Sequence, residues 1–351
     1  MKILLLSRYG YLGASSRYRF YQYLPYLQQQ GIEVEVAPLL DDEYIKDLYA
    51  GRKKNMLNIM KAYVRRINLI KRTKFFDLLW IEKEVLPWLP DWIECYLGLS
   101  KVPYVVDYDD AIFHRYDQHK FKLVRTLLGG KIDRVMRGAA LVVTGNEYLA
   151  DRARNAGAGR IEILPTVIDL EKYICIPQPI NNAFTIGWIG SPATARYLTH
   201  IVPALKEVCR QVEARVVLIG AGKVDLPDVP VQYVCWSNTT EVDEMQRFDV
   251  GIMPLPDEPW ERGKCGFKLI QYMACARPVV GSPVGINRKI IQHGVNGYQA
   301  ETIDEWVHTL LLLQKNNEHR QRMGEVGRKL VENEYSLQTT APQLVKLLKS
   351  I

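Results

Sequence analysis

Short apolar runs alternate with segments of helical periodicity from one end of the chain to the other, and this alternation most constrains the fold. It is typical of parallel sheets built from strand–helix–strand units. The runs are rich in β-branched residues, as expected for strands buried on both faces. The strands we expect are residues 2–7, 33–37, 78–81, 104–107, 141–144 and 161–164, and then 185–189, 215–219, 232–235, 250–255 and 278–281. The sequence therefore predicts an α/β protein.

The chain has 351 residues, which is too long for one ordinary core and predicts two domains. The segment 174–182 contains two prolines and two asparagines and is interpreted as a linker. We expect one doubly wound domain over residues 1–175 and a second over 183–334. A helix over 335–351 would return towards the first domain. Tandem domains of this kind bind ligands in a cleft at the carboxyl ends of their strands. The expected helices are residues 16–30, 121–137, 147–155, 195–212, 241–247 and 267–276.

Composition excludes several classes of protein. With 48% hydrophobic and 24% charged residues, the chain is neither disordered nor fibrous. No apolar run reaches the roughly 18–20 residues that cross a bilayer. The four apolar residues that precede Ser7 are too few for a secretory signal, which needs about 7–15. The six cysteines form no C-x-x-C pair, so we expect no metal site, no disulfide framework and a cytoplasmic location.

Residues 52–74 carry nine Lys or Arg and no acidic residue, although the net charge of the whole chain is only +7. Apolar residues recur there at helical spacing, which predicts a basic amphipathic helix. One interpretation is peripheral contact with anionic lipid on the inner face of the cytoplasmic membrane. The alternative is a surface helix packed on its own sheet, whereas nucleic acid is disfavoured because aromatic platforms are missing. The candidate membrane residues are Arg52, Lys53, Lys54, Lys61, Arg65, Arg66, Lys71 and Arg72.

The segment 259–285 contains a candidate anion site. Arg262, Lys264 and Lys268 surround Gly263 and Gly266 where a loop enters a helix. Backbone N–H groups at a helix N-terminus together with nearby cations favour an anion such as a diphosphate. The alternative is a glycine-containing surface loop with solvated lysines.

Three carboxylates gather at the end of an expected strand, in Asp107-Tyr-Asp109-Asp110, with His114 shortly after. Clustered carboxylates repel, so we expect at least one raised pKa, which suits a group that shares a proton or holds sugar hydroxyls. The alternative is that Asp107 or Asp109 caps the next helix. His114 is interpreted as a cleft residue or as an ordinary packed histidine.

Two further features are candidate binding elements. The loop Gly10-Tyr-Leu-Gly13 precedes a helix that carries Arg17 and Arg19, and these cations could meet phosphate or acceptor. The loop is not a G-x-G-x-x-G motif, so it supports a nicotinamide dinucleotide only weakly. A tight turn with a serine cap is the alternative. Trp236 follows a strand and is placed either against a nucleobase or in the core.

The second half of the chain resembles the family 4 retaining glycosyltransferases. The segments that carry the resemblance are Lys-Leu-Ile-Gln-Tyr-Met-Ala-Cys-Ala-Arg-Pro-Val-Val over 268–280, His-Gly-Val-Asn-Gly over 293–297, Leu-Pro-Thr-Val-Ile-Asp over 164–169, Phe-Thr-Ile-Gly-Trp-Ile-Gly over 184–190 and Arg-Met-Gly-Glu-Val-Gly-Arg over 322–328. The resemblance implies a GT-B fold, which consists of two tandem Rossmann-like domains with a cleft between them. It also implies transfer of a sugar from a nucleotide-diphosphate sugar with retention, without an obligatory metal or other cofactor.

The chain departs from that family at two places. The family's paired glutamates fall on Gly263 and Gln271, so Glu258 or Glu261 is a candidate substitute for the first of them. The family's phosphate-binding Arg falls on Ser191, so Lys264 and Lys268 would supply the lost charge with help from the Gly190–Ser191 backbone. From the residues and the resemblance together, the candidate donor-binding residues are Gly190, Ser191, Trp236, Glu261, Lys264, Gly266, Phe267, Lys268 and Gln271.

The resemblance predicts a glycosyltransferase of polysaccharide or cell-envelope synthesis with a saccharide or lipid-linked acceptor. Asp109, Asp110 and Lys268 are the candidate catalytic residues. Gly10, Gly13, Arg17, Arg19 and His114 would line the acceptor side. Two alternatives stay open at this point: a sugar-nucleotide epimerase of the same fold, and a non-catalytic membrane-associated subunit.

Overall fold

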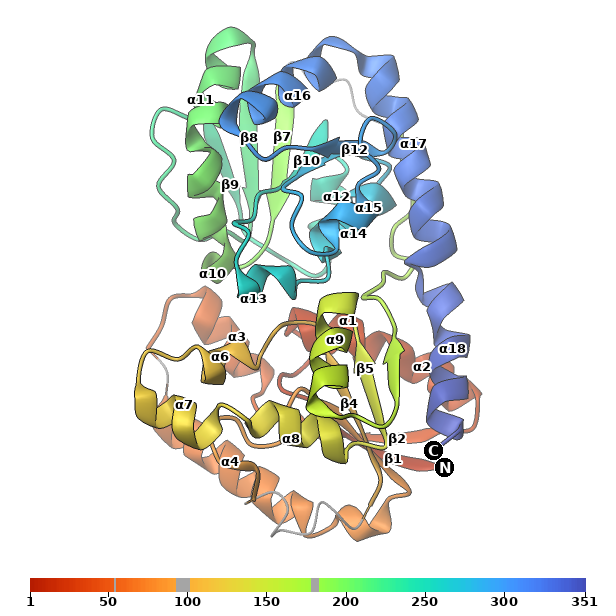
Figure 1. Ribbon diagram of the computed structural model, residues 1–351. Helices are drawn as coiled ribbons and strands as arrows, with labels where there is room; N and C mark the ends of the chain where they lie inside the picture. The colour runs from red at the N-terminus through yellow and green to blue at the C-terminus, as the bar shows by residue number, and fades with distance from the viewer. Residues whose placement is uncertain (54, 93–101, 178–182) are drawn as a thin grey trace. The chain divides into compact units, whose positions relative to one another are not determined.

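The computed structural model describes residues 1–53, 55–92, 102–177 and 183–351, and these form two compact units (Figure 1). The first unit consists of Met1–Thr166, Arg262–Cys265 and Thr340–Ile351. The second consists of Val167–Glu261 and Gly266–Thr339. Each unit is built on one parallel sheet, so the carboxyl ends of its strands share one edge.

The sheet of the first unit has the order β2-β1-β3-β4-β5-β6. Strand order reverses between β1 and β3, and ligands bind at such switch points in open α/β sheets. The strands are β1 (Lys2–Leu6), β2 (Glu33–Val36), β3 (Leu78–Glu82), β4 (Tyr104–Tyr108), β5 (Leu141–Thr144) and β6 (Ile161–Ile163). The α-helices are α1 (Ala14–Arg19), α2 (Leu24–Gln29), α3 (Asp42–Tyr49), α4 (Met56–Ile70), α6 (His114–Asp117), α7 (Lys122–Leu128), α8 (Lys131–Gly138) and α9 (Glu147–Ala156). Short 3-10 helices are η1 (Tyr21–Tyr23) and η2 (Thr73–Phe75).

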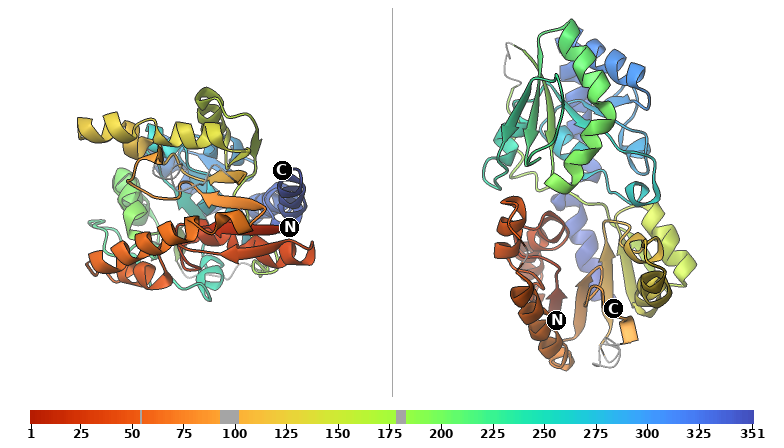
Figure 2. Two further views of the ribbon diagram at one scale, coloured as in Figure 1. Left: turned by 90° about the horizontal axis from the view of Figure 1, so that it is seen from below. Right: turned by 90° about the vertical axis from the view of Figure 1, so that its left-hand side faces the viewer.

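The C-terminal helix α18 (Leu337–Lys349) has its last residues in the first unit. The hydroxyls of Tyr23 and Thr340 lie 3.0 Å apart, and Arg160 Nη1 donates to Ser350 Oγ at 2.8 Å. The crossover of the chain end is therefore present. Figures 1 and 2 both show α4 along the outside of this unit.

The sheet of the second unit has the order β12-β11-β10-β7-β8-β9, with its switch point between β7 and β10. The strands are β7 (Phe184–Ile189), β8 (Ala214–Ile219), β9 (Val231–Val234), β10 (Val250–Met253), β11 (Val279–Gly281) and β12 (Gly297–Gln299). The α-helices are α10 (Pro192–Ala195), α11 (Val202–Gln211), α12 (Glu241–Met245), α13 (Pro259–Arg262), α14 (Phe267–Ala274), α15 (Asn287–Ile290), α16 (Ile303–Lys315) and α17 (Asn317–Glu334), with the 3-10 helix η4 (Arg196–Ile201).

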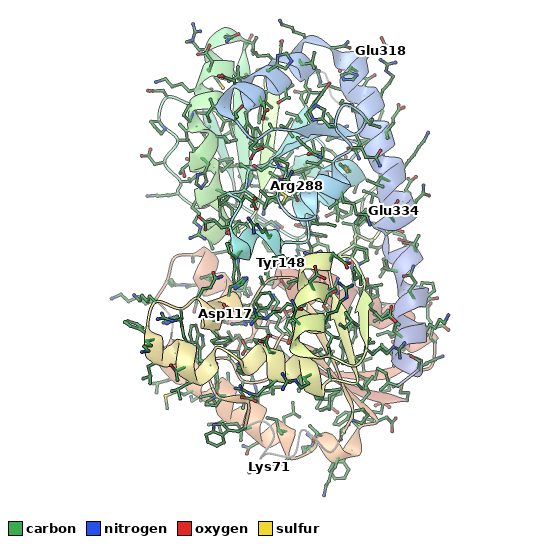
Figure 3. All side chains as sticks on the ribbon, viewed as in Figure 1. Lys71, Asp117, Tyr148, Arg288, Glu318 and Glu334 are labelled. Carbon is green, nitrogen blue, oxygen red and sulfur yellow. The ribbon has the colours of Figure 1, made fainter. Side chains whose placement is uncertain are left out.

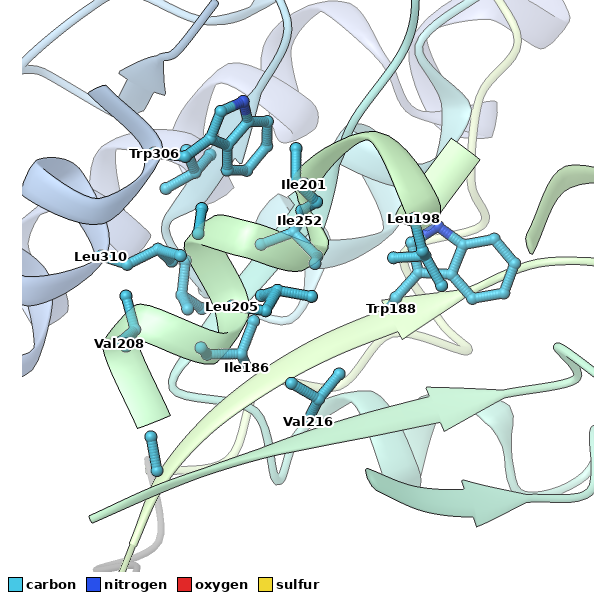
Figure 4. Close-up of a cluster of buried hydrophobic side chains, with 14 of the residues drawn as sticks. Ile186, Trp188, Leu198, Ile201, Leu205, Val208, Val216, Ile252, Trp306 and Leu310 are labelled. Atoms are coloured by element: carbon cyan, nitrogen blue, oxygen red, sulfur yellow. The ribbon is translucent and has the colours of Figure 1, made fainter. Parts of the chain in front are cut away.

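The core of the second unit lies between its sheet and two helices (Figure 4). Ile186 of β7 packs with Leu205 of α11 and with Trp306 and Leu310 of α16, all of them buried. Helices α14 and α17 pack together, and α14 also contacts β10 and β11. The switch-point edge is thus backed by rigid, buried elements.

The predicted fold class is confirmed, and local breaks are where the sequence reading was wrong. The expected helix 16–30 is divided into α1, η1 and α2, and Pro25 lies in the first turn of α2. The expected helix 121–137 divides at Gly129 and Gly130 into α7 and α8. Strand β12 and several helices, among them α3, α16 and α17, were not predicted. Part of the predicted linker, residues 178–182, lies outside the described residues, as does Cys95.

Candidate active site

At the carboxyl edge of the second sheet, Lys268 lies beside the loop that follows β7. A Cβ added at Gly190 would stand 2.9 Å from Lys268 Cε and 2.5 Å from the Trp188 ring. Only a glycine therefore lets this loop approach the lysine so closely. The Lys268 ammonium lies 5.3 Å from the centre of the Trp188 ring. The structure thus brings together two of the residues predicted to hold a diphosphate.

Trp236 belongs to the same edge. A Cβ at Gly220 would lie 2.5 Å from Gly190 O and 3.0 Å from Trp236 Cβ, so the ends of β7, β8 and β9 meet there. The Trp236 indole N–H donates to Glu241 Oε2 at 2.6 Å, which fixes the ring. Trp236 is half-buried at the edge of the sheet.

The prediction that the Gly190–Ser191 backbone helps to bind phosphate is wrong in this structure. Gly190 N–H donates to Ile219 O at 3.0 Å. Ser191 N–H donates to Thr194 Oγ1 at 3.3 Å, within a capping box at the start of α10. Each of these two N–H groups therefore already has a partner within its own unit.

Three other predicted donor residues are tied into the second unit. Gly266 precedes α14 with φ +65, and a Cβ there would lie 2.4 Å from Ile290. Phe267 begins α14 and is half-buried. Gln271 is buried, and its amide nitrogen donates to Tyr173 Oη at 2.8 Å. The side-chain amide of Gln271 is therefore already hydrogen-bonded to Tyr173. A ribose hydroxyl that bound Gln271 would have to share this amide with Tyr173.

Glu261, the candidate substitute for the missing glutamate, is a buried carboxylate with 2% of its surface exposed. One oxygen accepts a hydrogen bond from Tyr197 Oη and lies 4.0 Å from Arg196. The other oxygen, Oε2, has no hydrogen-bond partner among the described residues. Glu258, the other candidate, directly precedes the short helix α13, which contains Glu261.

In the first unit, the ends of β3 and β4 form a charged cluster at the switch-point edge. Lys83, directly after β3, has its ammonium 2.7 Å from Asp109 Oδ1 and 3.5 Å from Asp110 Oδ2. Lys264 Nζ lies 3.6 Å from Asp110 Oδ1. Two cations therefore alternate with two carboxylates. Sequence reasoning missed Lys83, although a charged run, Glu82-Lys83-Glu84, at the end of a strand could have indicated it.

The raised pKa that we predicted for at least one carboxylate of this cluster falls on Asp107, whereas the pKa of Asp109 is lowered. Burial alone would raise the pKa of Asp109, but the Lys83 ammonium outweighs burial, so the pKa lies below its ordinary value. The pKa of the Lys83 ammonium is itself raised: burial opposes the charged form, and the attraction of Asp109 and Asp110 exceeds that effect. The ion pair with Lys83 therefore favours the charged form of Asp109.

The segment Arg262–Cys265, which includes Lys264, is fastened to the ends of β4 and β5. Asn146 Nδ2 donates to Gly263 O and Lys264 O, both at 3.0 Å, and Cys265 Sγ donates to Asp109 O at 3.1 Å. A Cβ at Gly263 would lie 2.5 Å from Ala111 Cβ. No side chain fits at Gly263 without movement, which gives a steric reason for the absence of the family's glutamate. In the structure, the Lys264 ammonium lies beside Asp110, whereas the sequence analysis predicted that Lys264 binds a diphosphate.

Asp107 and Arg19 form a buried pair, which corrects the prediction that Arg19 meets phosphate or acceptor. Arg19 donates from Nε to Asp107 Oδ1 at 2.8 Å and from Nη2 to Asp107 Oδ2 at 2.9 Å, and both side chains are 2% exposed. Burial raises the pKa of Asp107 to about 6, against the opposing charge of Arg19. Removing one partner of such a pair costs about 3–5 kcal/mol of stability because the other charge stays buried. The pair holds α1 on the sheet.

The remaining predicted acceptor residues also have internal partners. Arg17 is buried, and its Nη1 donates to Tyr11 O at 3.4 Å. His114 Nδ1 lies 2.9 Å from Asp117 Oδ1 and its Nε2 lies 2.9 Å from Tyr148 Oη; Figure 3 labels both partners. The loop that begins at Gly10 is held by Asp42, whose Oδ1 accepts from Leu12 N at 2.8 Å. Gly13 N–H donates to Gly10 O at 3.1 Å, which closes a tight turn.

The predicted basic helix is α4, and one of its candidate membrane residues is wrong. Arg66 is 2% exposed, and its Nη2 donates to Ser7 O at 2.6 Å and to Ala37 O at 2.8 Å. Its side chain therefore binds α4 to the chain after β1 and β2 and does not face solvent. Arg65 donates to Leu39 O at 3.3 Å, and Arg52 pairs with Asp47 at 2.8 Å. Arg52, Lys61 and Arg65 also line a cavity of about 400 Å³ between α3 and α4.

The outer face of α4 is nevertheless apolar, and exposed basic residues lie on the helix and beside both of its ends. Met56, Leu57, Met60 and Val64 are between 58% and 68% exposed and share one face of the helix. Lys53, Lys61, Lys71 and Arg72 are exposed as well, and Figure 3 labels Lys71 at the end of the helix. Lys54 lies outside the described residues.

Two features are absent from the described residues. Within them, no group of three or more His, Cys, Asp and Glu side chains is arranged to hold a metal ion. Among the same residues, no helix combines the length and the apolar character that crossing a bilayer requires.

Comparison with known proteins identifies the class. Residues 183–316 match the family described as "Glycosyl transferases group 1", which confirms the resemblance found in the sequence. The protein is a glycosyltransferase with the GT-B fold, and the matched segment is its group 1 glycosyltransferase domain. No curated protein matches the chain by sequence.

Solved structures share the fold over the whole length. Sucrose-phosphate synthase from Thermosynechococcus elongatus is 13% identical with a TM-score of 0.73, over 100% of this chain and 98% of that one. Anabaena HepE in complex with UDP and glucose is 16% identical with a TM-score of 0.72, over 100% of both chains. A glycosyltransferase from Rickettsia africae is 12% identical with a TM-score of 0.67, over 99% and 98%. At these identities the likeness shows the fold alone.

Proposed function

We propose that this glycosyltransferase takes its sugar from a nucleotide-diphosphate sugar held at the carboxyl edge of the second unit. The observation that carries the proposal is the approach of Lys268 to Gly190 beside the switch point between β7 and β10. Trp236 lies at the same edge, and its ring is the proposed partner of the base. The solved structures of Anabaena HepE with UDP and with UDP-glucose support a uridine nucleotide as the first donor to test.

The chemistry we propose depends on positive charge. The Lys268 ammonium lies where a developing diphosphate would need neutralisation, which lowers the barrier to cleavage of the bond between sugar and phosphate. With retention, the acceptor hydroxyl would attack the sugar carbon from the same face as the departing diphosphate. The leaving phosphate would take the proton of that hydroxyl. The buried Oε2 of Glu261 is the proposed acceptor for a hydroxyl of the donor sugar.

Lys268→Ala should weaken UDP binding about 10- to 100-fold, the effect of losing one hydrogen bond to a charged group. Titration calorimetry measures this affinity. Lys329→Ala is the matched control, since Lys329 is an exposed lysine on α17 of the same unit. Unchanged UDP affinity in Lys268→Ala, or an equal loss in both variants, would contradict the proposed donor site.

For the acceptor, we propose a saccharide, free or lipid-linked, bound at the charged cluster of the first unit. The apolar outer face of α4, with exposed basic residues on the helix and beside both of its ends, supports a peripheral position on the inner, anionic face of the cytoplasmic membrane, as expected for a cell-envelope or polysaccharide enzyme. Each cation near such a surface contributes about 1 kcal/mol.

A further inference from the structure

The residue that follows β3 adopts a backbone conformation that is rare for any residue other than glycine. Lys83 has φ +66, and Glu84 N–H donates to Glu82 O at 2.7 Å, which makes Lys83 the centre of a three-residue turn. A turn of this hand is rare and strained, and glycine or asparagine would adopt it at lower cost. The lysine at this position indicates that its side chain, and not its backbone, is what the site requires.

Both neighbours of Lys83 hold the strained turn in place. Glu82 Oε2 accepts from Ser16 Oγ at 2.6 Å and from Arg8 N at 2.7 Å. Glu84 Oε2 accepts from the buried Lys131 ammonium at 2.8 Å. Because the turn is fixed at both sides, the direction of the Lys83 side chain towards Asp109 and Asp110 is fixed too.

The two carboxylates differ in how far solvent reaches them. The side chain of Asp109 is 12% exposed and that of Lys83 is 7% exposed, whereas that of Asp110 is 28% exposed. Lys83 and Lys264 approach the two oxygens of Asp110 at 3.5 and 3.6 Å. Contacts of this length orient a carboxylate by charge and leave its lone pairs open to a shorter hydroxyl donor.

We propose that Lys83 is a positioning residue, which locks Asp109 and Asp110 so that Asp110 receives a hydroxyl of the acceptor sugar. The inference rests on the proposed function and gives different roles to the two aspartates, which the sequence analysis treated alike. Asp110 contacts the acceptor, and Asp109 is the buried partner of Lys83. The cluster lies beside the switch point between β1 and β3, where a sheet of this order binds ligands.

The ionisation of Asp109 distinguishes a positioning role from a merely structural one. Lys83 is the group that keeps the pKa of Asp109 low against burial. The titratable and charged groups that face Asp109 are Glu82 and Lys83 at the end of β3, Asp107 and Asp110 near it in sequence, Arg19 on α1 and Cys265. Without Lys83, burial and the neighbouring carboxylates raise the pKa of Asp109.

Lys83→Asn tests the proposal, because asparagine tolerates the left-handed conformation but carries no charge. With UDP-glucose as donor and a panel of octyl glycosides as acceptor, the acceptor KM should rise about 10- to 100-fold. The KM for UDP-glucose and its slow hydrolysis without acceptor should not change. Asp110→Asn should raise the acceptor KM likewise. Lys122→Asn, at an exposed lysine on α7, is the matched control.

A second measurement does not depend on the acceptor. Carbon NMR of labelled aspartates should show the pKa of Asp109 rising in Lys83→Asn, and the acid side of the transfer profile should move to higher pH. Lys83→Arg should largely restore both. The proposal is overturned if the pKa of Asp109 stays low in Lys83→Asn, if the acceptor KM is unchanged, or if wild type uses no octyl glycoside. Loss of UDP binding by wild type would instead overturn the proposed function.

Discussion

Gly263 occupies the position at which the resembling family has a glutamate, and its surroundings explain the exchange. A Cβ there would stand 2.5 Å from Ala111 Cβ and 2.9 Å from Ala111 N. The carbonyls of Gly263 and Lys264 accept from Asn146, so this backbone is held against its neighbours. Gly263→Glu should therefore lower transfer instead of improving it, and should cost about 1–3 kcal/mol of stability through overpacking.

Transfer rate and urea unfolding measure the two effects of Gly263→Glu. Gly263→Ala should show the steric cost without the added charge. Gly159→Ala, where a Cβ meets nothing within 4 Å, is the matched control. A Gly263→Glu variant with higher transfer and unchanged stability would show that the segment can move to admit a side chain.

At the same scale, the Asp109 cluster shows where sequence reasoning stops. The three acidic residues and their place after a strand could be read from the chain, and repulsion among them predicted a raised pKa. Parallel pairing sets Glu82 beside Asp107, which brings Lys83 to Asp109 from a different strand. The direction of a pKa shift that depends on strand register cannot be obtained from local sequence. The same holds for Arg19, whose partner Asp107 is 88 residues away.

Among the elements, the helical periodicity of α4 was predictable, but which of its Lys and Arg side chains lie on the buried face was not. Arg66 lies on the buried side because Ser7 O and Ala37 O accept from it. The apolar residues Met56, Leu57, Met60 and Val64 lie on an exposed side that a helix packed only on its own sheet would not need. The packed-helix interpretation therefore holds for the buried face of α4, and the exposed face is the one to which the proposed lipid contact would apply.

The triple variant Lys61→Gln, Lys71→Gln and Arg72→Gln tests the outer face of α4. Removing three cations at about 1 kcal/mol each should weaken binding to anionic vesicles about 100-fold, measured by sedimentation at low salt. Donor hydrolysis should be unchanged. The matched control replaces the exposed lysines Lys315, Lys329 and Lys349 by Gln. Equal sedimentation of the triple variant and wild type, or an equal loss in the control, would remove the membrane proposal.

For the whole molecule, alternation of strands and helices was enough to predict two parallel sheets, since each sheet is built from consecutive units. Two features escaped. Helix α16 lies in an apolar-periodic stretch, with Trp306, Leu310 and Leu313 on one face, and this periodicity could have predicted it, whereas α17 is mostly polar. The assignment of Arg262–Cys265 to the first unit had no local signal, because it depends on Asn146 and Asp109, both far away in the chain.

The return of the C-terminal residues to the first unit predicts that the two ends of the molecule stabilise one another. Leu344 and Leu348 of α18 are fully buried, although most of the preceding 170 residues belong to the second unit. Leu348→Ala should destabilise the first unit by about 2–5 kcal/mol, the usual cost of a buried leucine. UDP affinity, a property assigned to the second unit, should stay within about twofold.

Calorimetric unfolding with and without UDP separates the two effects of Leu348→Ala. UDP at about 100 times its Kd should add roughly 2.7 kcal/mol to the unit that binds it, in wild type and variant alike. The exposed Leu123, on α7 of the first unit, provides the control Leu123→Ala, which should change neither quantity. A Leu348→Ala variant with wild-type stability would mean that α18 rests on the first unit without supporting it. A variant that no longer binds UDP would mean that the crossover helix stabilises both units together.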